Sequence, residues 1–267
     1  MDSDDDGDQH VDEELYFQLM VQEKVHLGDG ITSTVIVKKD MKSFGTIISL
    51  RLLDFLNHFF GRDFTCVVSV DEVIKIGGTT SRRATLELCN SIIDLYKEQY
   101  LRDPTTEDLA RLLSENKLRG FLGMIDSLDC MHWRWDACPI AWRGQYNGRY
   151  GYPTLILEAA TSQDLWIWHA FFGMLGTNNN VTVLDHSLLF NKYMDGTAPP
   201  VEYEVNGTLY NLPYYLTDGI YPKHAFFMQA VRNPITAKEK AFIISQEACR
   251  KDIERAFGVL KQKWRIL

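Results

Sequence analysis

Three acidic residues in the C-terminal half of the chain stand where carboxylates could do chemistry. Asp129 lies in SLDCMHW at the end of an apolar segment, and Asp218 lies in YYLTDGIYP directly after another. Glu254 lies in RKDIERAFGVLK, at the border of an apolar helical stripe. A carboxylate beside buried residues is either paired or used. Each of the three is therefore a candidate, although each by itself is more typical of a loop cap or a surface residue.

Two aspartates at strand ends and one glutamate on a helix can converge on a pair of divalent cations. Such a pair activates a water molecule and stabilises the leaving oxygen during in-line cleavage of a phosphodiester. The five cysteines form no CxxC pair and no compact set with the histidines, so hard oxygen ligands favour Mg²⁺ or Mn²⁺ over Zn²⁺. We therefore expect Asp129, Asp218 and Glu254 to be both the catalytic and the metal-binding residues.

The elements that must position these residues follow from the hydrophobic pattern. From residue 120 onward, six segments have the pattern of strands: Gly123–Cys130, Thr154–Ala160, Leu165–Phe172, Val201–Val205, Thr208–Leu212 and Tyr214–Thr217. The segments Ser162-Gln163-Asp164 and Asn206-Gly207 have the composition of hairpin turns. A long helix is predicted from about Lys238, with an apolar stripe formed by Ile253, Ala256, Phe257, Leu260, Trp264 and Leu267. This order predicts an α/β fold with helices packed on a mixed sheet.

The chain before residue 120 has helical periodicity. Helices are predicted over Met41–Phe60, over Val70–Ile76, from an N-cap at Thr79 or Thr80 to Tyr100, and onward from Pro104-Thr105. Asp108 is spaced to close a capping box on Thr105.

Three basic residues are candidate DNA contacts. Arg82 and Arg83 begin the long helix that follows the glycine pair at 77–78, a layout that resembles the recognition segment of a helix-turn-helix. Lys261 lies two helical turns after Glu254 on nearly the same face, where it could meet a DNA phosphate. A solvated surface lysine is an equally good interpretation of Lys261.

Charge is distributed unevenly along the sequence. The formal net charge is −8, and eight acids within residues 2–14 account for all of it. Residues 223–267 carry ten basic and four acidic residues, the opposite sign to the whole chain. Because phosphate binding depends on the local field, an acidic total does not exclude a nucleic-acid partner.

The sequence lacks a signal peptide and any uninterrupted apolar stretch of about 20 residues. We therefore expect an intracellular, soluble protein with reduced cysteines and no membrane partner.

Five blocks of sequence carry a family resemblance: SLDCMHW, CPIAWRGQYNGRYGYPTLILEA, DLWIWHAFFGMLGTNNNVTVLDHSLLF, APPVEYEVNGTLYNLPYYLTDGIYP and RKDIERAFGVLK. In this order they resemble the plant branch of the PIF/Harbinger transposases and the harbinger transposase-derived nucleases. The resemblance runs from about Glu72 to the last residue and is strongest from Gly120 onward. It implies an RNase H-like core, a mixed sheet flanked by helices, in which Asp129, Asp218 and Glu254 are the three metal-binding acids of a DDE nuclease. Asp126, Asp185 and Asp252 rank lower because they fall outside the matched positions.

The resemblance also implies partners and a location. We expect double-stranded DNA as substrate, a divalent metal as cofactor, a Myb-like DNA-binding protein as partner, and the nucleus, with the cytoplasm second, as location. The expected organisation is an acidic tail (1–14), a poorly assigned helical region (15–70), a small helix-turn-helix-like region (71–118) and the endonuclease domain (119–267).

A rival interpretation is a catalytically weak or inactive remnant that binds DNA or a protein. The sequence ends 13 residues after Glu254, whereas the family core continues with further helices. The final apolar stripe is therefore expected to have fewer partners than in an intact family core, so that the segment after about Ala248 frays and Glu254 is poorly fixed. An unrelated RNase H-like RNA nuclease is a third interpretation and the weakest.

Overall fold

The computed structural model describes residues 20–27, 31–38, 78–100, 102–136, 138–196, 198 and 200–263. The acidic tail and the predicted helices over Met41–Phe60 and Val70–Ile76 lie outside these residues. Contacts between Cα atoms divide the chain into two compact units, Met1–Lys42 and Ser43–Leu267. The domain boundaries proposed from the sequence stay predictions.

The first unit contains an antiparallel hairpin. Its strands are β1 (Met20–Leu27) and β2 (Ile31–Lys38), with Met20 opposite Lys38. The sequence analysis expected helical structure in this region, and for these two segments that expectation is corrected. The physical reason is visible in β2, whose sequence ITSTVIVK is dominated by β-branched residues that favour strands over helices.

The second unit begins in its described part with two helices, α4 (Gly78–Tyr100) and α5 (Thr106–Leu118). The predicted N-cap of α4 at Thr79 or Thr80 is wrong, because both residues already lie inside the helix. The capping box of α5 is confirmed. Thr105 Oγ1 accepts a hydrogen bond from the Asp108 backbone N–H, and the Thr105 N–H donates to Asp108 Oδ2 at 2.9 Å.

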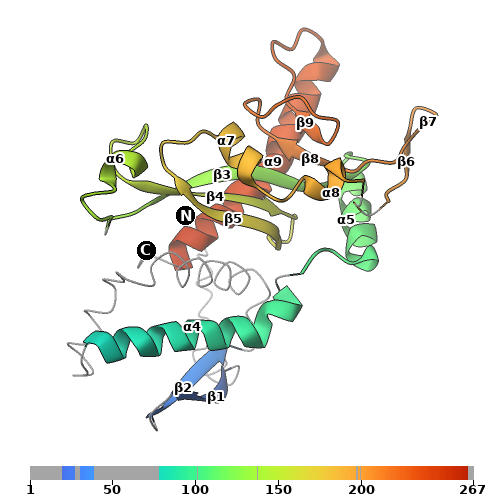
Figure 1. Cartoon of the computed structure of the whole chain (residues 1–267). Helices are drawn as coiled ribbons and strands as arrows, with labels where there is room; N and C mark the ends of the chain where they lie inside the picture. Colours follow the sequence, from blue (N-terminus) through green and yellow to red (C-terminus); the bar gives the residue numbers. More distant parts are fainter. Residues whose placement is uncertain are drawn as a thin grey trace, which may run out of the picture. The chain divides into compact units, whose positions relative to one another are not determined.

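A five-stranded mixed sheet forms the centre of this unit (Figure 1). Its strands are β3 (Met124–Arg134), β4 (Thr154–Thr161), β5 (Ile167–Leu175), β8 (Tyr214–Thr217) and β9 (Phe227–Gln229). Their order in the sheet is β5-β4-β3-β8-β9. The pairs β5–β4 and β4–β3 are antiparallel, whereas β3–β8 and β8–β9 are parallel. The predicted α/β class with a mixed sheet is confirmed.

The predicted hairpins are present, and several shorter elements were not predicted. β6 (Tyr203–Val205) and β7 (Thr208–Tyr210) pair across Asn206-Gly207, both of which have positive φ, as a tight hairpin turn of this type requires. The elements that the sequence analysis missed are β9 and the short helices α6 (Arg143–Tyr146), α7 (Asn180–His186) and α8 (Asn191–Met194). Each has seven residues or fewer, too few for a periodic pattern to be recognised.

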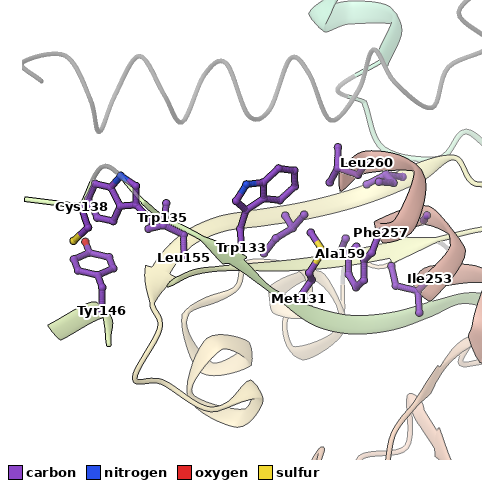
Figure 2. Close-up of a cluster of buried hydrophobic side chains, with 13 residues drawn as sticks. Met131, Trp133, Trp135, Cys138, Tyr146, Leu155, Ala159, Ile253, Phe257 and Leu260 are labelled. Carbon is purple, nitrogen blue, oxygen red and sulfur yellow. The ribbon is translucent and has the colours of Figure 1, made fainter. Parts of the chain in front are cut away.

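The helix α9 (Ala237–Lys263) lies on one face of the sheet and contacts β3, β4 and β8 (Figure 1). Figure 2 shows Ile253, Phe257 and Leu260 of this helix clustered with Met131 and Ala159 of the sheet. All of these side chains are buried. As far as Leu260, the strands themselves cover the stripe, so the expected shortage of apolar partners is not found there. Two further stripe residues, Trp264 and Leu267, lie outside the described residues.

Within the described part of the chain, no helix has the length and apolar character needed to cross a bilayer. Cys130, Cys138 and Cys249, whose side chains the structure describes, are free thiols.

Candidate active site

The two faces of β3 differ in what they contact. Ser127 Oγ donates a hydrogen bond to the carbonyl oxygen of Cys249 on α9, and Met131 packs on the same helix. Leu128 instead belongs to a core cluster with Leu184 of α7. Because side chains alternate along a strand, Asp129 lies on the face that α9 covers.

Asp129 is tied to α9 through one arginine. Arg250 Nη1 donates to Asp129 Oδ2 at 3.0 Å, and Arg250 Nη2 lies 3.0 Å from Glu254 Oε1. The other oxygen of Asp129, Oδ1, accepts a hydrogen bond from the Cys130 N–H at 2.8 Å. Arg250 and Glu254 are one helical turn apart, so both point toward the same part of the sheet. A single guanidinium thus bridges two of the three predicted site residues.

Asp218 reaches the same region from the neighbouring strand. It is the first residue after β8, which runs parallel to β3 with Leu216 opposite Ser127. Strands that run parallel end at the same edge of a sheet, so the residue after β8 lies beside the middle of the longer β3. Asp218 Oδ1 accepts a hydrogen bond from the Ile220 N–H at 3.0 Å, which fixes one oxygen of the half-buried side chain.

The electrostatics show that the three carboxylates interact. The pKa of Asp129 is raised from 3.8 to about 6, first because the side chain is buried and also because Asp218 and Glu254 place negative charge near it. The Cys130 hydrogen bond and the Arg250 charge lower the same pKa without cancelling the rise. The structure therefore brings Asp129, Asp218 and Glu254 into electrostatic contact, on β3, after β8 and on α9.

The described residues contain no group of three or more His, Cys, Asp or Glu side chains close enough together to hold a metal ion. Arg250 supplies a physical reason, because its guanidinium lies between the carboxylates of Asp129 and Glu254. The donors around it are carboxylate oxygens, the ligand type that Mg²⁺ and Mn²⁺ prefer.

Comparison with protein families identifies the chain. The model of the family described as plant transposon protein matches residues 98–267. The chain belongs to this family. The match confirms the resemblance to plant transposases, and it spans all three of the interacting carboxylates. No match was found among curated proteins or among solved structures.

The competing carboxylates of this plant transposon family member have other surroundings. Asp252 is buried and paired with Arg119, whose Nη1 lies 2.7 Å from Asp252 Oδ2, and with Arg255. Asp126 lies on the face of the sheet opposite α9 and lines a cavity of about 430 Å³ there. Asp185 is exposed on α7. None of these three acids contacts Arg250. The structure therefore separates them from the group formed by Asp129, Asp218 and Glu254.

The predicted DNA-contacting residues lie on two helices. Arg83 is exposed on α4 and lies 3.9 Å from Glu87, and the side chain of Arg82 lies outside what the structure describes. Lys261 is exposed on α9. Burial, followed by the charges of Arg149 and Lys261, lowers the pKa of His132 to about 4.

Arg250 is the site residue that sequence reasoning missed. It was counted only among the bases of the C-terminal segment. Its spacing of four residues before Glu254, on the same helix face, was the available signal. That signal was weak, because such pairs are common on exposed helices.

Proposed function

We propose that this plant transposon family member is a divalent-metal-dependent DNA endonuclease, with Asp129, Asp218 and Glu254 as its metal-binding and catalytic residues. One observation carries the proposal: three carboxylates from β3, β8 and α9 interact on one face of the sheet, and a cation already lies between two of them. The family match supports a transposase-related role.

The topology of the sheet supports the finer assignment of an RNase H-like fold. When the five strands are numbered in chain order, their order across the sheet is 3-2-1-4-5. Strand 2, which is β4, runs antiparallel to the other four. This arrangement places the middle of the first strand beside the end of the fourth, where Asp129 and Asp218 lie. A helix after the fifth strand then carries Glu254 to the same place.

The donor set fits a pair of hard divalent cations. Asp129 Oδ2 and Glu254 Oε1 now contact a guanidinium, whose positive charge stands in for a metal ion. When bound, Mg²⁺ or Mn²⁺ would activate water and stabilise the leaving oxygen of a phosphodiester. Asp129, from a rigid strand, would hold the ions in place. Glu254 is half exposed, so it would be accessible to a metal ion and to DNA.

A plasmid-nicking assay tests the proposal. Purified protein is incubated with supercoiled plasmid in Mn²⁺, in Mg²⁺ and in EDTA, and the Asp218→Asn and Asp126→Asn variants are assayed in parallel. Nicking that needs the metal, is lost in Asp218→Asn and persists in Asp126→Asn supports the proposed site. Equal nicking by the wild-type protein and Asp218→Asn would refute it.

A second candidate function is DNA or protein binding without chemistry. The observation that favours it is the lack of a ready-made metal cluster among the described residues. Saturable binding of the plasmid or of a duplex with no nicking in either metal would support this alternative.

Substrate, location and partner are part of the same proposal. The substrate is double-stranded DNA, the site of action is the nucleus, and a Myb-like DNA-binding protein supplies sequence recognition. A fluorescent fusion found only outside the nucleus would contradict the proposed location.

A further inference from the structure

Arg250 has an unusual position for a charged residue on a helix surface. Its side chain is 21% exposed, and two of its nitrogens each lie 3.0 Å from a carboxylate oxygen of a different residue. One of these, Asp129, is 16% exposed and belongs to a strand, while Glu254 is 49% exposed. The guanidinium therefore joins a buried acid of the sheet to an accessible acid of the helix.

The charge balance distinguishes this arrangement from an ordinary structural ion pair. At the buried Asp252, two arginines, Arg119 and Arg255, surround one carboxylate. At Asp129 one arginine serves a group of three acids, since Asp218 and Glu254 both act on Asp129 electrostatically. Asp252 thus has two positive charges beside its single negative charge. Asp129, Asp218 and Glu254 together have only one positive charge beside them, so this group has a deficit of positive charge.

A deficit of this kind is filled best by a cation of higher charge. A divalent ion brings twice the charge of a guanidinium and binds at a shorter distance to oxygen, so its Coulomb attraction to the same carboxylates is greater. A metal ion and the guanidinium cannot occupy the space between Asp129 and Glu254 together. Binding of one must therefore displace the other.

We propose that Arg250 is an exchangeable internal counter-ion. In the metal-free protein it holds Asp129 and Glu254 together and limits their repulsion. A divalent ion displaces it, and the released guanidinium becomes available for a DNA phosphate, to which arginine binds well. Among the described residues, Asp129 and Glu254 are the only carboxylates at ion-pair distance from Arg250, so displacement leaves it without an acidic partner there. This inference rests on the proposed function, because it requires a metal ion at these carboxylates.

The first test measures metal affinity in the absence of DNA. Mn²⁺ binding is followed by electron paramagnetic resonance or calorimetry for the wild-type protein, Arg250→Gln and Lys251→Gln. Lys251 is the exposed neighbour of Arg250 on α9, so its replacement removes the same charge without touching the bridge. We expect Arg250→Gln to bind Mn²⁺ about tenfold more tightly than wild type, because a charge-assisted competitor is gone. Lys251→Gln should change the affinity by less than about twofold.

The results for wild type and Arg250→Gln distinguish failure of the counter-ion role from failure of the proposed metal site. Equal or weaker Mn²⁺ binding by Arg250→Gln, with saturable binding by wild type, would overturn the counter-ion role alone and leave the proposed nuclease standing. No saturable binding by wild type or either variant would overturn the proposed metal site and this inference with it. If Arg250→Gln does not fold, as judged by circular dichroism, Arg250→Lys replaces it. Lysine keeps the charge but cannot bridge two carboxylates with a planar fork, so tighter Mn²⁺ binding is again expected.

The second test determines whether the released guanidinium of Arg250 contacts DNA. Binding of a labelled DNA duplex is measured in EDTA and in Ca²⁺, an ion that occupies carboxylate sites and often does not support cleavage. Wild type should bind DNA several-fold more tightly in Ca²⁺, and Arg250→Gln should lose most of that gain, whereas Lys251→Gln should keep it. An equal gain in wild type and Arg250→Gln would show that the released side chain does not contact DNA.

Discussion

The two faces of β3 each carry an aspartate, Asp126 buried and Asp129 half-buried, and the two differ in what surrounds them. Asp126, on the face opposite α9, is 2% exposed, and its Oδ1 has no hydrogen-bond partner in the described part of the chain. Burial raises its pKa well above the usual value. Asp129, on the α9 face, has Arg250 as a cation and two other acids nearby. Burial is therefore shared by both aspartates, whereas the cation and the neighbouring acids are found only at Asp129, the candidate site residue.

The same contrast extends to the neighbouring strand. Glu158 on β4 lies on the face of Asp126 and is fully buried, with His169 Nε2 3.4 Å from its Oε1. His169 Nε2 also lies 3.0 Å from Ser187 Oγ. Glu158 and Ser187 are buried, so they are less accessible to a large substrate such as DNA. The α9 side of the sheet instead has an exposed acid, Glu254.

The largest expected effect is on cleavage. Replacing Asp129 by Asn should reduce the metal-dependent nicking rate a thousandfold or more, on the order of 4 kcal/mol in the barrier, because a metal ligand is lost. Asp126→Asn, on the other face, should leave the rate within about twofold of wild type, since it is remote from the proposed chemistry. Initial rates on supercoiled plasmid measure both. A similar loss in the two variants would show that cleavage does not depend specifically on the α9 face of β3.

The next effect concerns the packing that holds each face. Ile253 is fully buried on α9 beside Glu254, and Leu128 is fully buried on the opposite face of β3. Replacing either by Ala should cost about 2–5 kcal/mol of unfolding free energy, measured by urea denaturation. Only Ile253→Ala should also weaken Mn²⁺ binding under conditions where the protein is folded. Weaker Mn²⁺ binding in Leu128→Ala instead would show that the faces are not independent.

A smaller effect is expected in the pH dependence of stability without metal. The folded pKa of Asp129, about 6, lies above the ordinary value of 3.8. As the pH rises, the unfolded chain therefore loses this proton first, and ionised Asp129 costs stability between about pH 4 and pH 6, roughly 2–3 kcal/mol in total. Asp129→Asn escapes this cost, so its stability relative to wild type should rise over that window and then stay constant.

Asp126→Asn provides the matched measurement. Burial also raises the pKa of Asp126 well above its ordinary value, so Asp126→Asn should likewise gain stability over wild type as the pH rises. Urea denaturation in EDTA from pH 4 to pH 8 gives both curves. A variant whose stability relative to wild type does not change over this range would contradict the raised pKa of the aspartate that it replaces.

The smallest effect is on DNA affinity. Lys261→Ala on α9 should weaken duplex binding a few-fold at low salt and reduce the salt slope by about one unit. Lys117→Ala, an exposed lysine on α5, serves as control because Leu109 of that helix packs on the opposite face of the sheet. Equal losses in the two variants would indicate non-specific attraction to a basic surface.

Much of the fold was predictable from the sequence because the elements have strong local signals. The strand over Tyr214–Thr217 and the capping box at Thr105 match the prediction, and the Asn206-Gly207 hairpin is present. The predicted strand around Asp129 was too short. The observed strand continues to Arg134, through residues whose alternating burial is set by α9 and α7. The hairpin of β1 and β2 was missed because its alternation is interrupted by charged residues such as Glu23 and Lys24.

The sequence by itself determined the residue types at the candidate site and the elements that carry them. Apolar segments ending in Asp129 and Asp218, and an amphipathic helix bearing Glu254, follow from local hydrophobic periodicity and from resemblance to a family. Only the tertiary structure decided which acids meet. Asp126 and Asp129 are three residues apart on β3, so alternation places them on opposite faces, and α9 packs only on the face of Asp129. Arg250 acquired its role the same way, because its contact with Asp129 joins residues 121 positions apart, and no local pattern encodes such a long-range contact.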